Sequence, residues 1–181
     1  MSLHKQPELK DAVLNLNQKE KDKLLVRLVG KDKMLMKQLH YQLLENEADL
    51  EDRITQLKEQ LREHFDMARR SVGNSPNYGN FKELNNVIRH ASGLVNEHEK
   101  VTKDKLSEVE CRLFILKQTF SYFPILFEPS TFTSAFKLSM YVKGRMKNAL
   151  SKYDKLHEDL QFDLHEEMDY ILAFAATHNL D

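Results

Sequence analysis

The residue types that could do chemistry gather towards the C-terminal end, beginning on a predicted helix over about 130–153. Arg145 lies on the apolar stripe of this helix. A guanidinium at such a position must pair with a carboxylate, reach towards solvent or bind an anion. Because Tyr141 and Lys152 lie nearby on the same helix, we expect Arg145, Tyr141 and Lys152 to bind an anion or to contact a partner protein. The alternative is an internal ion pair between Arg145 and the acidic segment that follows the helix.

A second set of residues, in that acidic segment, has the types that bind divalent cations. If the chain from about 155 to 177 forms one helix, four polar side chains share a narrow stripe on it: Asp154, Glu158, His165 and Asp169. Carboxylates combined with an imidazole suit a divalent metal ion. The apolar stripe of the same helix points in nearly the opposite direction, so the alternative for these four residues is a solvent-exposed charged face.

The motifs of the common enzyme classes are absent from the sequence. The glycines stand apart, which excludes a phosphate-binding loop, and no nucleophile elbow or zinc-protease motif is present. Cys111 lies beside an apolar helix seam, which favours a packed thiol over a nucleophile. His98 lies on an inward helix face, which favours a core histidine with one hydrogen-bond partner. We therefore expect no catalytic residues and no cofactor, and the sequence leans away from an enzyme.

The charges are balanced overall but separated along the chain. The formal net charge is −1, yet residues 130–155 carry a local net charge of +5 and residues 156–181 carry −7. Two neighbouring helices could complement each other, or one charged face could meet a partner. Nucleic-acid binding would use the basic helix over 137–155. However, its lysines point in all directions around the helix, and the adjoining acidic residues would repel phosphate.

The composition also bears on the compartment. No run of about 18 apolar residues is present, so we expect no membrane span. A single cysteine and an N-terminus without an apolar leader are typical of a cytoplasmic protein.

Composition and periodicity predict that helices position all of these residues. Five glycines and four prolines in 181 residues are too few for the turns of a β-sandwich or barrel. Apolar residues at spacings of 4-3-4-4-3-4, which form two eleven-residue units rather than heptads, predict one long, straight helix over about 47–72. A strict heptad seam over 106–123 predicts a helix that packs within the chain or against a second copy, and Phe114 and Ile115 widen its apolar face, which indicates a central helix. We expect an all-α protein, either a bundle or a short helical-repeat array of seven or eight helices.

The clearest candidate boundary is the segment 73–79, which is rich in Gly, Asn, Ser and Pro. It predicts an N-terminal helical region over 1–72, a loop or hinge over 73–79, and a C-terminal helical bundle over 80–181. The alternative is one continuous domain. The sequence Asn80–Glu83 has the form of a capping box, so we expect a helix to begin there.

These patterns favour a non-enzymatic helical protein that binds another protein or itself, as an interaction or scaffold protein. The long charged helix and the separated basic and acidic helices both suit recognition through helix faces. Two alternatives remain open. The first is a metal- or anion-binding protein or an enzyme that uses the acidic C-terminal helix and Arg145. The second is a nucleic-acid-associated protein that uses the basic helix over 137–155.

Overall fold

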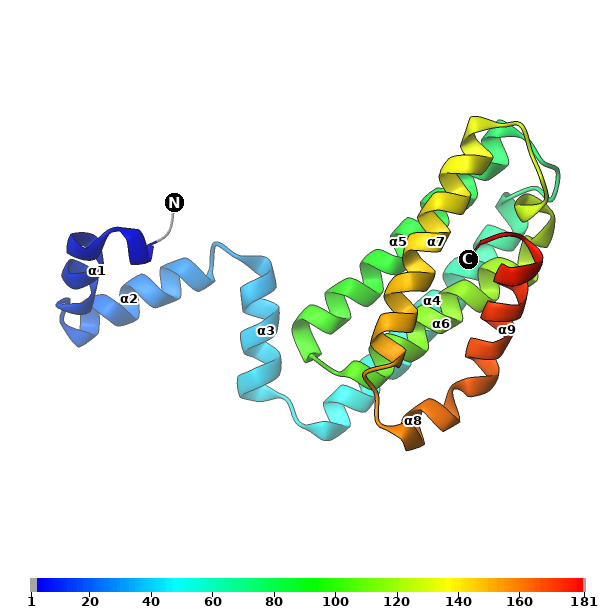
Figure 1. Ribbon diagram of the computed structural model, residues 1–181. Coiled ribbons are helices and arrows are strands. Elements are labelled where there is room, and N and C mark those ends of the chain that lie inside the picture. The colour runs from blue at the N-terminus through cyan, green and yellow to red at the C-terminus, as the bar shows by residue number, and fades with distance from the viewer. Residues whose placement is uncertain (1–2, 181) are drawn as a thin grey trace. The chain divides into compact units, whose positions relative to one another are not determined.

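The structure, a computed structural model, describes residues 3–180, and these residues form nine α-helices and no strand (Figure 1). The predicted all-α fold is therefore confirmed. Two short 3-10 helices, η1 (Leu3–Lys5) and η2 (Pro124–Phe127), complete the secondary structure. The α-helices are α1 (Pro7–Leu14), α2 (Gln18–Val29), α3 (Lys33–Leu44), α4 (Glu47–Ser71), α5 (Tyr78–Thr102), α6 (Lys105–Tyr122), α7 (Thr133–Tyr153), α8 (Glu158–Asp163) and α9 (His165–Thr177).

The chain divides into two units, and the first of them ends at Glu45. Two of its helices, α2 and α3, are capped by side chains at their N-termini. Asn17 and Glu20 form a reciprocal capping box at the start of α2, and the Asp32 side chain accepts from two backbone amides of α3. None of the residues in α1, α2 and α3 is buried, although these helices are amphipathic. Residues 3–45 of this unit therefore have local helix signals but form no hydrophobic core.

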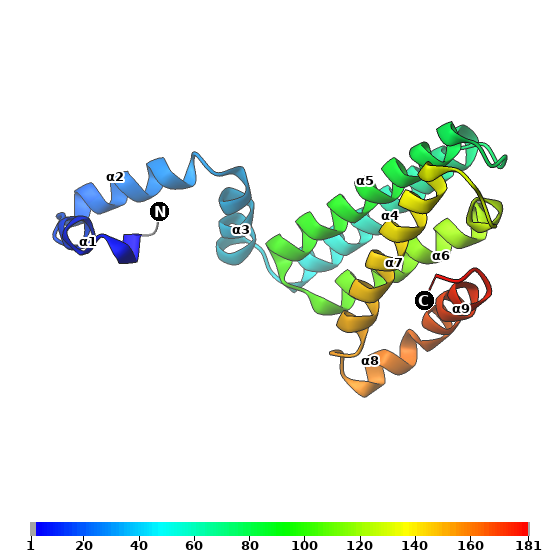
Figure 2. The same cartoon turned by 45° about the horizontal axis from the view of Figure 1, so that its top comes forward.

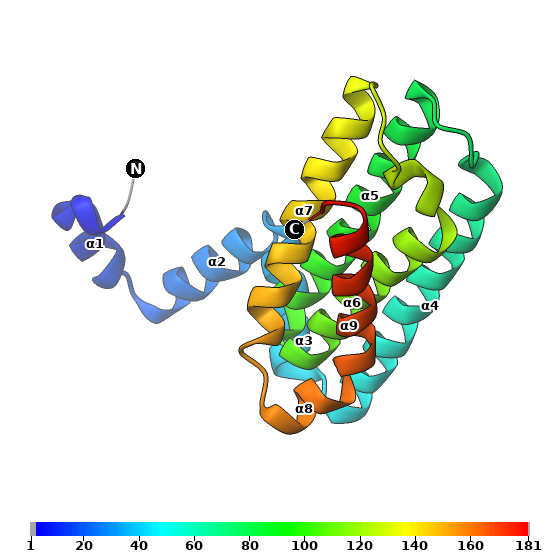
Figure 3. The same ribbon diagram turned by 45° about the vertical axis from the view of Figure 1, so that its right-hand side comes forward.

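The second unit, from Asn46 onwards, is a bundle built on α4, α5, α6 and α7. Successive helices of this set reverse direction, so the bundle runs up, down, up and down, and α5 and α7 are parallel (Figures 1 and 2). Helix α6 packs against α4, α5, α7 and α9, which makes it the central helix (Figure 3). The central position was predicted from the sequence. Neighbouring helices of the same chain pack on the seam.

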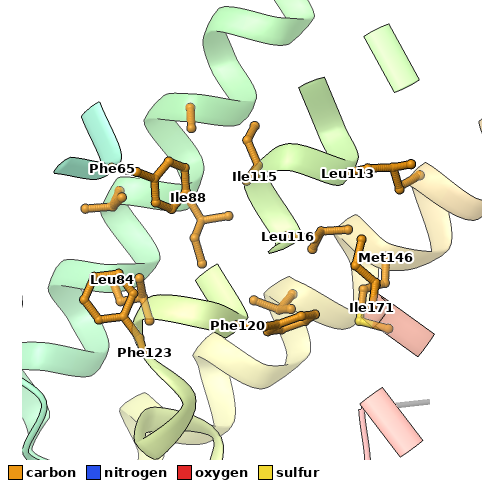
Figure 4. Packing of buried hydrophobic residues seen from close by; sticks show 14 of the residues in the cluster. Phe65, Leu84, Ile88, Leu113, Ile115, Leu116, Phe120, Phe123, Met146 and Ile171 are labelled. Carbon is orange, nitrogen blue, oxygen red and sulfur yellow. The ribbon is translucent and has the colours of Figure 1, made fainter. Parts of the chain in front are cut away.

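The core of the bundle is formed by apolar side chains from Leu57 to Leu180 (Figure 4). Phe65, Phe120 and Phe123 are each no more than 1% exposed. Phe120 stacks on Phe174 of α9, with ring centroids 4.2 Å apart, and meets Phe127 of η2 edge to face. These aromatic contacts tie α9 and η2 to the central helix, since each such pair adds to the free energy gained by burial.

The loop predicted as a hinge lies inside the bundle. Helices α4 and α5, on its two sides, pack against each other, and the division between the units falls at 45/46 instead. Helix α5 begins at Tyr78 and is capped by the Asn77 side chain, so the capping box predicted at Asn80 does not form. The Asn80 side chain instead bonds Ser75 and Gly73 across the loop, at 2.8 and 3.3 Å. The loop is therefore a hydrogen-bonded turn between two packed helices.

The last predicted helix is broken into two, which raises the count from eight to nine. Residues 154–157 separate α7 from α8, and Leu164 separates α8 from α9. Side-chain bonds to the backbone hold the first break. The Tyr153 hydroxyl donates to the Gln161 carbonyl at 2.7 Å, and the Gln161 amide donates to the Leu156 carbonyl at 3.0 Å. Neither glycine nor proline marks these breaks in the sequence.

Candidate functional site

Two arginines meet one tyrosine on the surface of the bundle, between α5 and α7. The guanidinium carbons of Arg89 and Arg145 lie 4.8 and 5.0 Å from the centroid of the Tyr141 ring. Arg145 and Tyr141 are four residues apart on α7, and Arg89 comes from α5 on the other side. We name these three residues the arginine–tyrosine cluster. It contains two of the predicted anion-site residues, together with one arginine that the sequence did not indicate.

No carboxylate among residues 3–180 lies within 4.0 Å of either guanidinium of this cluster. The internal ion pair expected as the alternative for Arg145 is therefore not present in that range. Arg89 donates from Nε to the side-chain oxygen of Asn85 at 3.2 Å. In the same described range, three buried polar side-chain atoms have no hydrogen-bond partner, and all three lie on α7: Ser134 Oγ, Arg145 Nε and Asn148 Oδ1. Helix α7, which carries Tyr141 and Arg145, thus has several buried polar atoms without a hydrogen-bond partner, which is unusual in a folded protein.

Lys152, the third predicted anion-site residue, belongs to a different arrangement. Its ammonium lies 2.8 Å from a carboxylate oxygen of Glu108, and the same carboxylate lies 2.6 Å from Arg112. Arg112 also donates to the Asn96 side chain at 2.8 Å. We name these four residues the buried ion-pair network, because Glu108 and Arg112 are 4% and 8% exposed. Glu108 pairs with both cations of the network, so the ammonium of Lys152 is already engaged by a carboxylate.

His98 and Ser107 form the arrangement that most resembles catalytic geometry. His98 Nε2 and Ser107 Oγ are 2.9 Å apart, a distance typical of a nucleophile and its base. Ser107 is only 1% exposed, however, so a substrate has no access to its hydroxyl. The pair joins the end of α5 to the start of α6. This confirms the prediction that His98 is a core histidine with a hydrogen-bond partner.

The predicted metal stripe is not assembled. Asp154 follows the last residue of α7, Glu158 lies in α8, and His165 and Asp169 lie in α9, with helix breaks between them. The His165 ring stacks on Phe162 and bonds its carbonyl oxygen. Among residues 3–180, no group of three or more His, Cys, Asp or Glu side chains could hold a metal ion. The stripe requires one continuous helix. Because the breaks interrupt that helix, the requirement is not met.

Cys111 lies at the base of a cleft of about 410 Å³ formed by α4, α6 and the C-terminal helices. Burial raises the pKa of its thiol to about 12, so it stays protonated at neutral pH and is a poor nucleophile. Two ion pairs border the cleft, Lys58 with Glu110 at 2.8 Å and Lys117 with Glu167 at 2.9 Å. The Lys117 hydrogen bond lowers the pKa of Glu167. The cleft therefore offers paired charges and an inert thiol, and the prediction of a packed cysteine is confirmed.

A second hollow, of about 280 Å³, is almost wholly apolar. It lies over α6, which contributes Leu113 and Leu116, between α7 and α9. Leu150 and Leu172 stand at its edges and are about two-fifths exposed. Its polar groups are lysines of α7, so it offers adhesion to an apolar side chain but no reactive group.

Three residues of the arginine–tyrosine cluster and the buried ion-pair network, Arg89, Glu108 and Arg112, were not predicted from the sequence. Arg89 contacts a tyrosine some fifty positions later in the chain, and no sequence spacing indicates such a contact. For Glu108 and Arg112, a signal was available. They are four residues apart on the helix whose seam predicts a central position, and a central helix must bury and pair such charges.

Comparison of the chain with known protein families, with curated proteins and with solved structures finds no match. None of the helices within residues 3–180 has the combination of length and apolar content that crossing a membrane requires.

Proposed function

We propose that the protein is a non-enzymatic, cytoplasmic interaction protein whose N-terminal helices, α1 to α3, bind a partner protein. The observation that supports this proposal is that these helices bury none of their residues. Their apolar side chains remain largely exposed, with Leu25 at 61% and Leu43 at 74%. Exposed apolar side chains gathered on neighbouring helices are a usual mark of an interaction surface.

The lengths of these helices support the same proposal. Helix α1 has 8 residues, and α2 and α3 have 12 each. Isolated helices shorter than about 12–15 residues are marginal in water, and most helices gain their stability by packing an apolar face. Because the first unit has no core, its helices need such a face from outside the unit. A partner that covers Leu25 and Leu43 would provide it.

The charge of the segment indicates what kind of partner protein fits. Residues 17–44 contain seven lysines and arginines against three acidic residues. An amphipathic helix with a basic polar side fits an apolar groove bordered by carboxylates. We therefore expect a protein with an acidic rim around an apolar groove.

The test is affinity capture of the full chain from its native cytosol after nuclease treatment, read by mass spectrometry. Two adjacent substitutions form a matched pair. Leu43→Glu places a charge on the exposed apolar surface, whereas Gln42→Glu adds the same charge at an exposed polar position. We expect wild type and Gln42→Glu to retain one stoichiometric protein, and Leu43→Glu to lose it with no change in melting temperature.

Loss of the protein from both variants, or from neither, would contradict a role for this apolar surface. Light scattering on the purified chain separates self-association from partner binding. A concentration-dependent dimer that Leu43→Glu abolishes would show that the surface binds a second copy, and the partner assignment would then fail.

A further inference from the structure

The arginine–tyrosine cluster places two positive charges against one tyrosine ring, with no carboxylate of residues 3–180 paired to either of them. Both guanidinium carbons lie within 5.0 Å of the centroid of the same ring. Attraction to the face of a tyrosine stabilises each guanidinium, and the gain is larger where the pair is desolvated. The like charges oppose this gain, because Arg145 is half-buried and its charge is less well screened there than in open water. The arrangement is therefore most favourable when an anion is present.

The hydrogen-bonding capacity of Arg145 also favours a bound anion. Its Nε is buried and has no partner, so the polar capacity of this side chain is not met within residues 3–180. Its terminal nitrogens make no hydrogen bond in that range and are not buried, so they are open to a ligand. Arg89 uses Nε on Asn85 and likewise leaves its terminal nitrogens available. Tyr141 holds both guanidinium groups at a fixed place on the surface.

The surrounding side chains add positive charge. Lys137 lies four residues before Tyr141, on the same row of α7 as Arg145, and it is exposed. Lys152, further along α7, is engaged by Glu108 of the buried ion-pair network, and Arg112 binds the same carboxylate. No acidic side chain of that network is left to neutralise the cluster.

We propose that the arginine–tyrosine cluster is a binding site for a phosphate monoester or inorganic phosphate. Two guanidinium groups match the charge of a phosphate dianion, and their forked donors suit its tetrahedral oxygens. A single carboxylate would need only one of the two arginines. The phosphoryl group is the chemistry that the site recognises, and its source is a small molecule. This site is independent of the partner surface on α1 to α3.

The experiment titrates inorganic phosphate and glycerol phosphate into the full chain at low ionic strength, by calorimetry and by melting temperature. Sodium chloride at matched ionic strength is the reference. Arg89→Gln is the main variant, because Arg89 is exposed and its loss leaves the core intact. Arg145→Gln is the second. Arg69→Gln is the matched control, since Arg69 also lies 5.0 Å from a tyrosine ring, that of Tyr122, but without a second arginine.

We expect saturable phosphate binding by wild type and by Arg69→Gln. We expect a loss of affinity of about tenfold or more in Arg89→Gln and in Arg145→Gln, the loss that follows from removing a charged hydrogen bond. Equal stabilisation by phosphate and chloride would overturn the proposal, and so would equal affinity in Arg89→Gln and Arg69→Gln. If inorganic phosphate binds but glycerol phosphate does not, the ligand is the free ion. If an oligonucleotide binds and neither small anion does, the site recognises nucleic acid, and the monoester assignment is wrong.

Discussion

At the scale of single residues, His98 makes the stability of the bundle depend on pH. Burial lowers the pKa of this histidine below its ordinary value of 6.5, with Arg53 acting in the same direction and Asp104 and Glu108 opposing it. The imidazole bonds Ser107 while it is held between α5 and α6. Its neutral form is therefore the one that the folded protein favours.

The sign of the pH effect follows from this pKa. Below pH 6.5 the unfolded chain takes up a proton on His98 that the folded chain does not yet bind, so unfolding becomes more favourable as the pH falls. At pH values well above 6.5, His98 contributes no pH dependence to the stability. We expect the urea midpoint to fall between pH 7 and pH 5, with at most about 1.4 kcal/mol per pH unit from this one group.

His98→Gln should reduce that slope, and His4→Gln, at an exposed position, should leave it unchanged. Urea unfolding followed by circular dichroism at several pH values measures both. An unchanged slope in His98→Gln would show that other groups carry the pH dependence.

At the scale of elements, the buried ion-pair network sets how α6 sits against α5 and α7. Glu108 of α6 holds Lys152 of α7, and Arg112 of α6 holds Asn96 of α5. Replacing Glu108 by Gln leaves the 8% exposed Arg112 without a carboxylate. Removing one partner of a buried ion pair costs about 3–5 kcal/mol. We therefore expect Glu108→Gln to lower the free energy of unfolding by about that amount.

The surface pair of Lys117 with Glu167 is the control for this prediction. Both side chains are more than a third exposed, so Lys117→Gln should lower the free energy of unfolding by only about 0–1 kcal/mol. Chemical denaturation of the two variants compares them directly. Equal losses would indicate that Glu108 contributes no more than a surface carboxylate. Glu108→Leu combined with Arg112→Met should recover part of the loss, since a well-packed apolar pair avoids the cost of burying charge.

The same elements show how far the sequence leads. Local signals were sufficient to predict helices along the chain, because the interactions that favour a helix lie within a few residues. The helix end near Tyr153 was predicted, but the break at Leu164 was not, because neither glycine nor proline marks it in the sequence. That break also removed the metal stripe, whose residues were aligned on an unbroken helix. The division at 45/46 was likewise hidden, since the most turn-rich loop lies between two packed helices.

The candidate site was predictable in part for the same reason. Arg145 and Tyr141 are one turn apart on one helix, so their proximity follows from helical spacing alone. Lys152 lies on the same helix, yet its partner, Glu108, is forty-four positions away, and only the packing of α6 on α7 brings them together. Long-range pairing decides which of two similar cations is left for a ligand, and a single sequence does not carry that information.

At the scale of the whole molecule, the two units differ in what holds them together. The hydrophobic core draws its residues from Leu57 to Leu180, so the bundle is complete without the first 45 residues. Removing residues 1–45 should leave the urea midpoint unchanged. The m-value should change little, because it scales with the surface that becomes buried on folding, and α1 to α3 bury none of their residues.

The shortened chain also separates the two proposals. It should bind phosphate with the affinity of the full chain, because Arg89, Tyr141 and Arg145 all lie in the bundle. It should lose the captured partner, because the exposed apolar residues around Leu25 and Leu43 are gone. A lower midpoint would instead show that residues 1–45 complete the core of the bundle, and their exposed leucines would no longer indicate a partner. Capture of the same partner by the shortened chain would place the interaction on the bundle itself and contradict the role proposed for α1 to α3.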